Sequence, residues 1–470
     1  MERRFAVRLD ELMAACQVEP EMFEGLTGRL EEFVEPFAQA VFRRRESKQH
    51  AQTYVAGLLS DLKRKNTESI AYRHDQGRQG LQRFIGFHQW DHRPLVTELV
   101  RQVSTHLGQA DAVIVFDPSG FSKKGDASVG VQRQWLGRLG KVDNGQVAIY
   151  MGYVSRVDHT LLDMRLYLPR EWAQDKPRRK KCGVPKDVRF QTRHQSALDM
   201  LAEHTEALPH TWVAGDDEMG RSTSFRRDLD ERSEQYLLAV PSNTTIRDLQ
   251  EKNPQQSGCG RRRKAPFRQV RQWLNAISPA AWSRIVVRDT EQGPLEVEIL
   301  KRRVQAKTEH RQVGPEEMLV VIRWREASGT IKHDYYLSNA PPKTSLKEFA
   351  RVAKAEHRIE ECIQRAKSQA GLADYEVRNW SGWHHHQVFS LIATWFLVFE
   401  TLRGKNWTPA ITVPQLRDAL AMLLHEACAC ATLERLARDK HRRTKRTEQA
   451  RFYHCKRRNC LPPLKHLQRK

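Results

Sequence analysis

The sequence lacks several features that define large classes of protein. Its eight cysteines among 470 residues are too few for a disulfide scaffold. The first residues contain no apolar core like that of a signal peptide. The longest apolar run, residues 388–399, contains Ser390 and Thr394 and is shorter than the about 20 residues that a membrane-spanning helix needs. We therefore expect a soluble, cytoplasmic protein with reduced thiols and no membrane partner.

Acidic residues are scarce relative to basic ones. The chain has 79 Lys and Arg against 57 Asp and Glu, which gives a formal net charge of +22. More than half of this excess lies in residues 435–470, where 14 basic residues accompany 2 acidic ones. Such an excess predicts a polyanionic partner, most simply nucleic acid bound through its phosphates. A disordered, solubilising tail is the alternative interpretation of the last segment.

Helical periodicity dominates the first hundred residues. Apolar side chains recur every three or four positions from Phe23 to Val41. Further helices are predicted at 48–63, 67–74, 78–88 and 94–106. This pattern suits either a helix-turn-helix-like DNA reader or a plain helical bundle. We assign residues 1–108 to a helical N-terminal DNA-binding region.

Strand patterns begin near residue 111 and predict an α/β protein. Short runs rich in β-branched residues are followed by alternating helices and strands, which indicates a mixed sheet covered by helices. A second set of strand-like runs precedes a return to helical periodicity. We therefore expect the first part of a mixed-sheet core at 109–240, a β-rich insertion at 241–344, the second part of the core at 345–402, and a helical C-terminal region with a basic tail at 403–470.

Three acids stand at positions suited to chemistry. Asp117 and Asp216 each end a predicted strand, and Glu360 lies in the later helix. Strand ends of open α/β sheets line the ligand crevice. Three carboxylates meeting there would hold two Mg²⁺ or Mn²⁺ ions, which can support an in-line phosphoryl transfer. Acids at strand ends are common, however, and composition alone does not show that these three meet.

Seven segments around these acids form a specific pattern. They read VFDPSGFSKKG at 115–125, SVGVQRQ at 128–134, LGKVDNGQV at 139–147, LYLPREW at 166–172, VAGDDEMGR at 213–221, IEECIQRAK at 359–367 and GLADYEVR at 371–378. Together they resemble the DDE transposases of bacterial insertion sequences, specifically insertion-sequence family 701, a relative of family 4. The resemblance covers the chain from about residue 50 to 400.

The resemblance implies an RNase H-like catalytic core interrupted by a β-rich insertion. It also implies that Asp117, Asp216 and Glu360 form the metal-binding triad. The family motifs select Asp216 rather than Asp217, and Glu360 rather than Glu361. Lys367, seven positions after Glu360 as in the family, is implied to contact a DNA phosphate.

The chain departs from the family pattern just before Glu360. Where related families have a Tyr and an Arg, this chain has Ala353 and Glu356. Arg358 replaces the family Trp and offers a further phosphate contact. Because the three acids are all present, we still expect catalytic activity.

Further DNA contacts are expected outside the triad. The basic residues after the first acid could lie beside the scissile phosphate or form a solvated loop: Lys123, Lys124, Arg133 and Lys141. A basic loop is predicted at Arg261, Arg262 and Arg263. Trp324, in the insertion, could stack on a flipped base or simply be a packed aromatic. His384, His385 and His386 point in different directions on a helix, and we expect them to make polar or phosphate contacts at the surface.

The sequence thus predicts a transposase that binds the terminal inverted repeats of its element, cleaves DNA, and transfers the 3′-OH ends to target DNA with two Mg²⁺ or Mn²⁺ ions. The expected partners are double-stranded DNA, both element ends and target, and further copies of the chain in a homodimer or higher multimer. The expected location is the cytoplasm, in association with the nucleoid. The alternatives are a non-catalytic transposase-derived DNA-binding or targeting protein, and a nuclease of the same fold that cuts without strand transfer.

Overall fold

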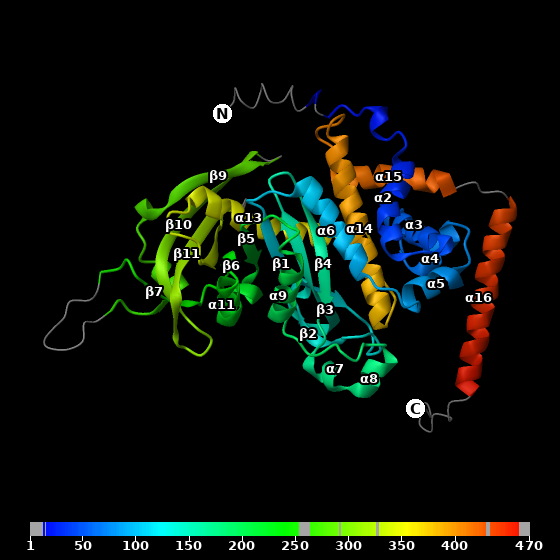
Figure 1. Ribbon diagram of the computed structural model, residues 1–470, viewed down its shortest axis with the longest axis horizontal. Helices are drawn as coiled ribbons and strands as arrows, with labels where there is room; N and C mark the ends of the chain where they lie inside the picture. Colours follow the sequence, from blue (N-terminus) through cyan, green and yellow to red (C-terminus); the bar gives the residue numbers. More distant parts are fainter. Residues whose placement is uncertain are drawn as a thin grey trace, which may run out of the picture.

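The computed structural model describes residues 13–14, 16–252, 264–290, 293–325, 329–428 and 433–459. A twisted sheet occupies the centre of the molecule, a helical bundle covers one end of it, and the strands of the insertion extend the other end (Figure 1). The predicted α/β class is confirmed by this arrangement. None of the helices in the described ranges is long and apolar enough to cross a bilayer.

The bundle is built around one buried helix, α14 (Trp380–Gly404). Most of its side chains, polar ones included, are buried on every side of the helix, as expected of a helix in a protein core. The amphipathic N-terminal helices pack on it or on one another. They are α2 (Leu26–Val41), α3 (Arg45–Leu59), α4 (Thr67–Arg73), α5 (Arg78–Gly86) and α6 (Arg93–Leu107), after the short η1 (Pro20–Met22). The helices predicted for this region are therefore confirmed.

The three consecutive histidines lie in the interior of this bundle, so the expectation of surface contacts was wrong. Nδ1 of His384 donates to the carbonyl oxygen of Trp380. The two ring nitrogens of His385 lie 2.8 and 2.9 Å from the carbonyl oxygens of Ile85 and Trp90, and the neutral ring donates to one of them. His386 bonds Tyr54 and the carbonyl oxygen of Gly371. Burial lowers the pKa of His385 to about 4 and those of its two neighbours to about 3. The uncharged rings therefore serve as polar joints between α14 and the helices around it.

Five strands form the part of the sheet outside the insertion, in the order β4-β3-β1-β5-β6. The first three pair antiparallel, and β5 and β6 run parallel to β1. This order and these directions are those of an RNase H-like core, as expected. The strands are β1 (Val113–Ser122), β3 (Lys141–Val154), β4 (His159–Leu166), β5 (Trp212–Gly215) and β6 (Gln235–Ala239). A short strand, β2 (Gln132–Leu136), and η2 (Gly137–Leu139) form a hairpin arm with the start of β3.

The strands of the insertion continue the same sheet. Strand β12 pairs antiparallel with β6, so the sheet extends without a break into the insertion. Its elements are β7 (Thr245–Asp248), β8 (Arg268–Gln269), α12 (Val270–Leu274), η3 (Pro279–Ala281), β9 (Ser283–Thr290), β10 (Gly293–Lys307), β11 (Val313–Arg325) and β12 (Ile331–Ser338). The predicted β-rich character of the insertion is confirmed. That its strands share one sheet with the core was not predicted from local patterns.

Helix α13 (Leu346–Gln369) lies across the core strands and carries Glu360. Its N-cap is Ser345, whose side chain accepts a bond from the backbone N–H of Glu348. A glycine on β3 lets the helix approach closely. A Cβ atom at Gly152 would lie 2.4 Å from Cδ1 of Ile359. Because Ile359 immediately precedes Glu360, this close packing fixes the height of Glu360 above the sheet.

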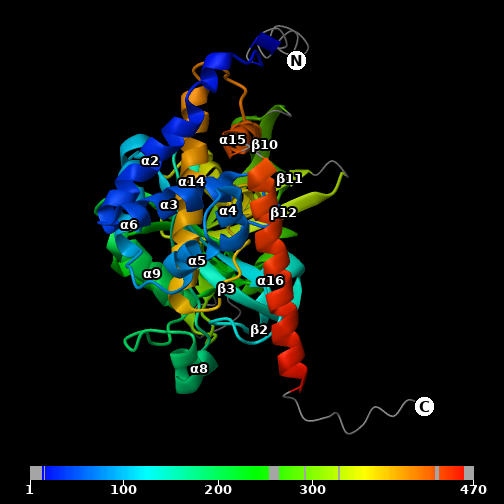
Figure 2. The same ribbon diagram turned by 90° about the vertical axis from the view of Figure 1, so that its right-hand side faces the viewer.

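The remaining helices complete the cover of the sheet and the C-terminal region. They are α7 (Arg170–Gln174), α8 (Lys176–Lys181), α9 (Arg193–His204), α10 (Asp217–Arg221), α11 (Thr223–Glu231), α15 (Val413–Cys428) and α16 (Leu433–Asn459). Helix α16 runs along the outside of the bundle (Figure 2). The predicted basic tail is therefore helical over residues 433–459.

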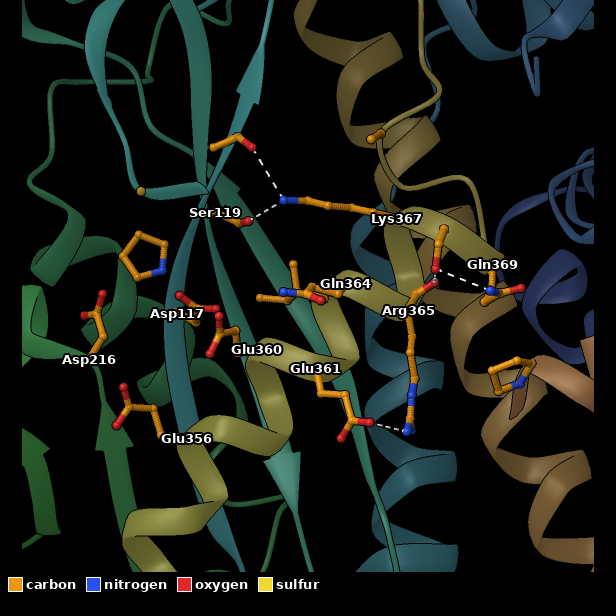
Figure 3. A pocket seen from close by; sticks show the side chains of 17 residues that line it. Asp117, Ser119, Asp216, Glu356, Glu360, Glu361, Gln364, Arg365, Lys367 and Gln369 are labelled. Atoms are coloured by element: carbon orange, nitrogen blue, oxygen red, sulfur yellow. Dashed lines mark hydrogen bonds and ion pairs between the residues drawn. The ribbon is translucent and has the colours of Figure 1, made fainter. Parts of the chain in front are cut away.

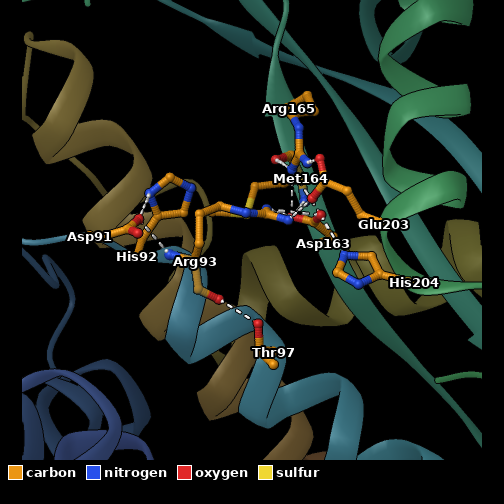
Figure 4. Close-up of polar contacts among 9 residues, drawn as sticks. All are labelled: Asp91, His92, Arg93, Thr97, Asp163, Met164, Arg165, Glu203 and His204. Carbon is orange, nitrogen blue, oxygen red and sulfur yellow. Dashed lines mark hydrogen bonds and ion pairs between the residues drawn. The ribbon is translucent and has the colours of Figure 1, made fainter. Parts of the chain in front are cut away.

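A buried ion-pair network joins the bundle to the sheet (Figure 4). Asp163 on β4 accepts bonds from Arg93 of α6 at 3.0 Å and from Arg165 at 2.8 Å, and it bonds Nε2 of His204 on α9 at 2.9 Å. Burial alone would raise the pKa of Asp163, but Arg165, His204 and Arg93 together hold it far below its usual range. This carboxylate is therefore ionised and fully paired.

Candidate active site

Two aspartates reach the same level of the sheet through the pairing of β1 with β5. These strands are parallel, and Phe116 lies opposite Gly215. Asp117 and Asp216 are the next residues on each strand, so they emerge side by side, since neighbouring strands are about 4.8 Å apart. Strand β5 ends there, as predicted. Strand β1 instead continues to Ser122, because it remains paired with β3.

Both aspartates line a cavity of about 950 Å³ together with Glu360 and Lys367 from α13. Figure 3 shows the carboxylates of Asp117 and Glu360 close to each other, with Asp216 on the far side of Asp117. Of the residues predicted to act in catalysis or beside it, these four are the ones that the fold brings to one cavity. Glu360 is largely exposed, and its Oε2 lies 3.7 Å from Nδ1 of His357.

The alternatives next in sequence point to other partners. Asp217 is 54% exposed and forms an ion pair with Arg221 at 2.9 Å. Glu361 lines the edge of the cavity but is ion-paired with Arg365. Asp216 instead accepts a bond from the backbone N–H of Met219 as the N-cap of α10. These contacts distinguish each candidate from its neighbour in sequence, and the roles of Asp216 and Glu360 stay predictions from the family motifs.

Without a bound cation, the environment of the cavity disfavours the charged forms of Asp117 and Asp216. Burial raises the pKa of Asp117 to about 8, and the charges of Asp216 and Glu360 add to this effect. Burial likewise raises the pKa of Asp216 to about 7, with contributions from Glu218 and Asp217. Lys367 lines the same cavity, and its charge lowers the pKa of Asp117 and so offsets part of this rise. Carboxylate oxygens gathered in one cavity are the type of ligand that Mg²⁺ and Mn²⁺ prefer.

A fourth acid, Glu356, lines the same cavity. In the family pattern this position is an arginine, so the sequence predicted no role for Glu356. Burial raises its pKa well above the usual value, and the nearby charges of Asp216 and Asp117 act in the same direction. The spacing of four residues between Glu356 and Glu360, which places both on one helix face, was the available signal.

Another group of potential metal ligands lies elsewhere and has a different character. Asp163, Glu203 and His204 are the one set of three in the described ranges whose ligand atoms all lie within 4.8 Å of one another. Arg93 and Arg165 already balance its charge. We therefore interpret this group as part of the ion-pair network. The carboxylates of the cavity are spaced more widely than this limit.

The other predicted DNA contacts occupy varied environments. Lys367 donates to Oγ of Ser119 at 2.7 Å at the edge of the cavity. Lys123 is half-buried, with Nζ 3.3 Å from the ring centroid of Tyr375, whereas Lys124, Arg133 and Lys141 are exposed. Arg358 is half-buried and is not among the residues that line the cavity. Arg261, Arg262 and Arg263 lie outside the described residues.

Trp324 and Trp135 differ in exposure. Trp324 is packed partly against the core, and Nζ of Lys354 lies 4.2 Å from its ring centroid. Trp135, which the sequence analysis did not select, is 57% exposed on β2. It lines a second cavity, of about 850 Å³, which shares Asp216 with the first. An aromatic residue two positions after Arg133 could have indicated a DNA contact from the sequence.

Comparison with known proteins places this geometry in a family. Residues 36–294 match the family described as DDE superfamily endonuclease. The chain belongs to this family. The matched range contains Asp117 and Asp216 and ends before Glu360.

Two further similarities accompany this DDE family match. Over 200 residues the chain is 31% identical to the probable transposase for insertion sequence element IS701 of Microchaete diplosiphon, an alignment that covers 41% of this chain and 49% of that protein. The chain thus spans about half the length of this curated relative. A cryo-EM structure of the piggyBac transposase synaptic complex with hairpin DNA aligns over 84% of this chain and 76% of that chain, with 11% identity and a TM-score of 0.41. The family match and the IS701 relative confirm the resemblance to DDE transposases.

Proposed function

We propose that this chain is a transposase that binds the ends of a DNA element, cleaves there, and transfers the freed 3′-OH ends to target DNA. The observation that carries the proposal is the cavity at the β1–β5 edge, where Asp117, Asp216 and Glu360 are gathered. Membership of the DDE endonuclease family supports the same chemistry. The net charge of +22 supports a DNA partner.

The three carboxylates are proposed to hold two Mg²⁺ or Mn²⁺ ions. The oxygen donors of the three acids, and the raised pKa values of Asp117 and Asp216, fit divalent cations, whose charge would relieve the repulsion between the acids. When bound, such ions activate the attacking hydroxyl and stabilise the leaving oxygen of a phosphodiester. Asp117, which lies between Asp216 and Glu360 in Figure 3, would hold the ions together with these two acids. Lys367, at the cavity edge, would hold a phosphate of the strand that enters.

The proposal includes DNA surfaces outside the cavity. Lys124, Arg133 and Lys141 are exposed on the hairpin arm and the loop before it, and would contact the backbone beside the cut. The exposed helix α16 would add contacts that do not depend on sequence. Assembly of two or more copies on the two ends is part of the proposal, as is a location with the chromosomal DNA.

Replacement of Asp117 tests the proposal. Asp117→Asn should abolish cleavage of duplex DNA that carries the element ends, in Mg²⁺ or Mn²⁺, and leave binding to those ends nearly unchanged. Cleavage and joining are measured on labelled duplexes, and binding by mobility shift. Asp217→Asn is the matched control, because Asp217 is exposed and ion-paired with Arg221, and it should cut normally.

The rival functions give different results in the same assay. Binding to the ends by the wild-type chain without cleavage in either metal would support a DNA-binding or targeting protein and contradict the proposal. Cleavage without any joined product would identify a nuclease that lacks strand transfer.

A further inference from the structure

Glu356 lies one helical turn before Glu360 on α13 and faces the same cavity. Residues four apart on a helix lie on one face, with Cβ atoms about 5–6 Å apart. Figure 3 shows the carboxylate of Glu356 on the Asp216 side of the cavity and that of Glu360 on the Asp117 side. Helix α13 therefore presents one glutamate to each of the two aspartates.

Among the described residues, no cation is paired with the carboxylate of Glu356. It is half-buried, and no hydrogen bond or ion pair of its carboxylate occurs among the described residues. Lys354, two residues earlier, attracts it from a distance but forms its ion pair with Asp334, at 3.7 Å. The charges that act most strongly on Glu356 are those of Asp216, Asp117, Asp334 and Glu360, all acidic.

A carboxylate in this position is unfavourable unless something compensates it. Burial disfavours the charged form, and the neighbouring acids repel it. An apolar or amide side chain of the same size would avoid both costs, so a purely structural role does not account for an acid here. A divalent cation in the cavity would account for it.

We propose that Glu356 is a fourth carboxylate ligand of the metal site, acting with Asp216 while Glu360 acts with Asp117. This inference rests on the proposed function, since it concerns the cations held by the same cavity. It changes the interpretation of the position from an absent arginine to an added ligand. The site of this chain would then carry one more negative charge than a three-acid site.

Mn²⁺ binding to the full chain without DNA tests the inference directly. The free Mn²⁺ signal in electron paramagnetic resonance gives the dissociation constant and the number of ions bound. Glu356→Gln keeps the shape of the side chain and removes its charge, and it should weaken binding of Mn²⁺ about tenfold or more. Because it also removes repulsion between acids, the variant should melt no earlier than the wild type in EDTA.

Two further variants separate the possible outcomes. Glu361→Gln is the matched control, since Glu361 lies at the cavity edge and is ion-paired with Arg365, and it should bind Mn²⁺ like the wild type. If Asp117→Asn weakens binding and Glu356→Gln matches Glu361→Gln, the fourth ligand is refuted and the proposed function stands. If neither Asp117→Asn nor Glu356→Gln changes Mn²⁺ binding, the metal site itself is refuted, and both proposals fail.

Discussion

Asp117 is held where its own negative charge is least stable. Burial and the charges of Asp216 and Glu360 raise its pKa to about 8. A carboxyl group that binds its proton more tightly in the folded chain than in the unfolded one lowers stability as the pH rises between the two pKa values. In the absence of metal, the site therefore costs folding free energy at neutral pH.

Asparagine at position 117 should remove this cost. We expect Asp117→Asn to raise the free energy of unfolding by at least about 1 kcal/mol at pH 8 in EDTA, since one pKa unit corresponds to about 1.4 kcal/mol. The difference should shrink toward pH 4, where the carboxyl of the unfolded wild type also becomes protonated. Thermal melts from pH 4 to 8 measure it, and a difference that does not vary with pH would contradict the argument.

Added Mn²⁺ provides the second half of this test. An ion that binds the folded chain and not the unfolded chain raises the Tm. The Tm of the wild type should therefore rise more than that of Asp117→Asn. Asp217→Asn is the control, because Asp217 is 54% exposed, and it should follow the wild type at every pH.

At the scale of the element, the hairpin arm of β2 and β3 presents an exposed apolar face beside the site. Trp135 is paired in register with Val142, and the two are 57% and 50% exposed. Arg133, two residues before Trp135 on the same strand, is also exposed. An exposed indole next to a cation is a suitable platform for an unpaired base.

The arm predicts a difference between the two tryptophans. Trp135→Ala should weaken binding of DNA with a single-stranded end by about 1–3 kcal/mol and have a smaller effect on a blunt duplex. Trp324→Ala should change the two affinities equally, because its ring is packed on the core and covered by Lys354. Fluorescence anisotropy at one salt concentration measures both. The reverse order would support base stacking by Trp324, as predicted from the sequence.

The helices and strands themselves were predicted more reliably than the contacts between them. Helices such as α6 and strands such as β5 follow from periodicity and short β-branched runs, which are local properties. The pairing of β12 with β6 is not local, and no pattern in either strand specifies its partner. The same limit applied to His384–His386, whose burial depends on the helices that surround α14.

The convergence of the candidate acids was predictable only from the family motifs. Asp117, Asp216 and Glu360 were selected by resemblance, and the cavity contains all three. Glu356 was missed because the family motif has an arginine at this position, so the comparison showed a missing arginine and gave no role to the glutamate. Its place beside Asp216 depends on the rotation of α13, which is fixed by packing such as that of Ile359 on Gly152.

At the scale of the whole molecule, positive charge is concentrated on α16. Residues 433–459 contain 11 Lys and Arg and 3 Asp and Glu, and much of the helix is exposed. It is tied to the bundle by ion pairs of Arg446 with Glu68 and of Arg438 with Asp75. These ion pairs leave the distal part of the helix available for phosphates.

Neutralising that part should reduce the salt dependence of DNA binding. We expect Lys445→Gln, Lys456→Gln and Arg457→Gln together to lower the slope of log K against log salt by about 0.9 for each phosphate that the helix no longer neutralises. Titrations at several salt concentrations measure the slope. Exchange of Lys for Arg and Arg for Lys at these positions keeps the charge and is the control. An unchanged slope in the Gln variant would show that α16 does not contact DNA.

The continuous sheet limits how this molecule can be divided. Because β12 is bonded along β6, removal of residues 241–344 would leave β6 as a bare edge with unpaired N–H and C=O groups. Such edges recruit strands from other molecules and promote aggregation. The insertion therefore cannot be deleted or exchanged like a separate domain, and an engineered minimal enzyme would need a substitute strand along β6.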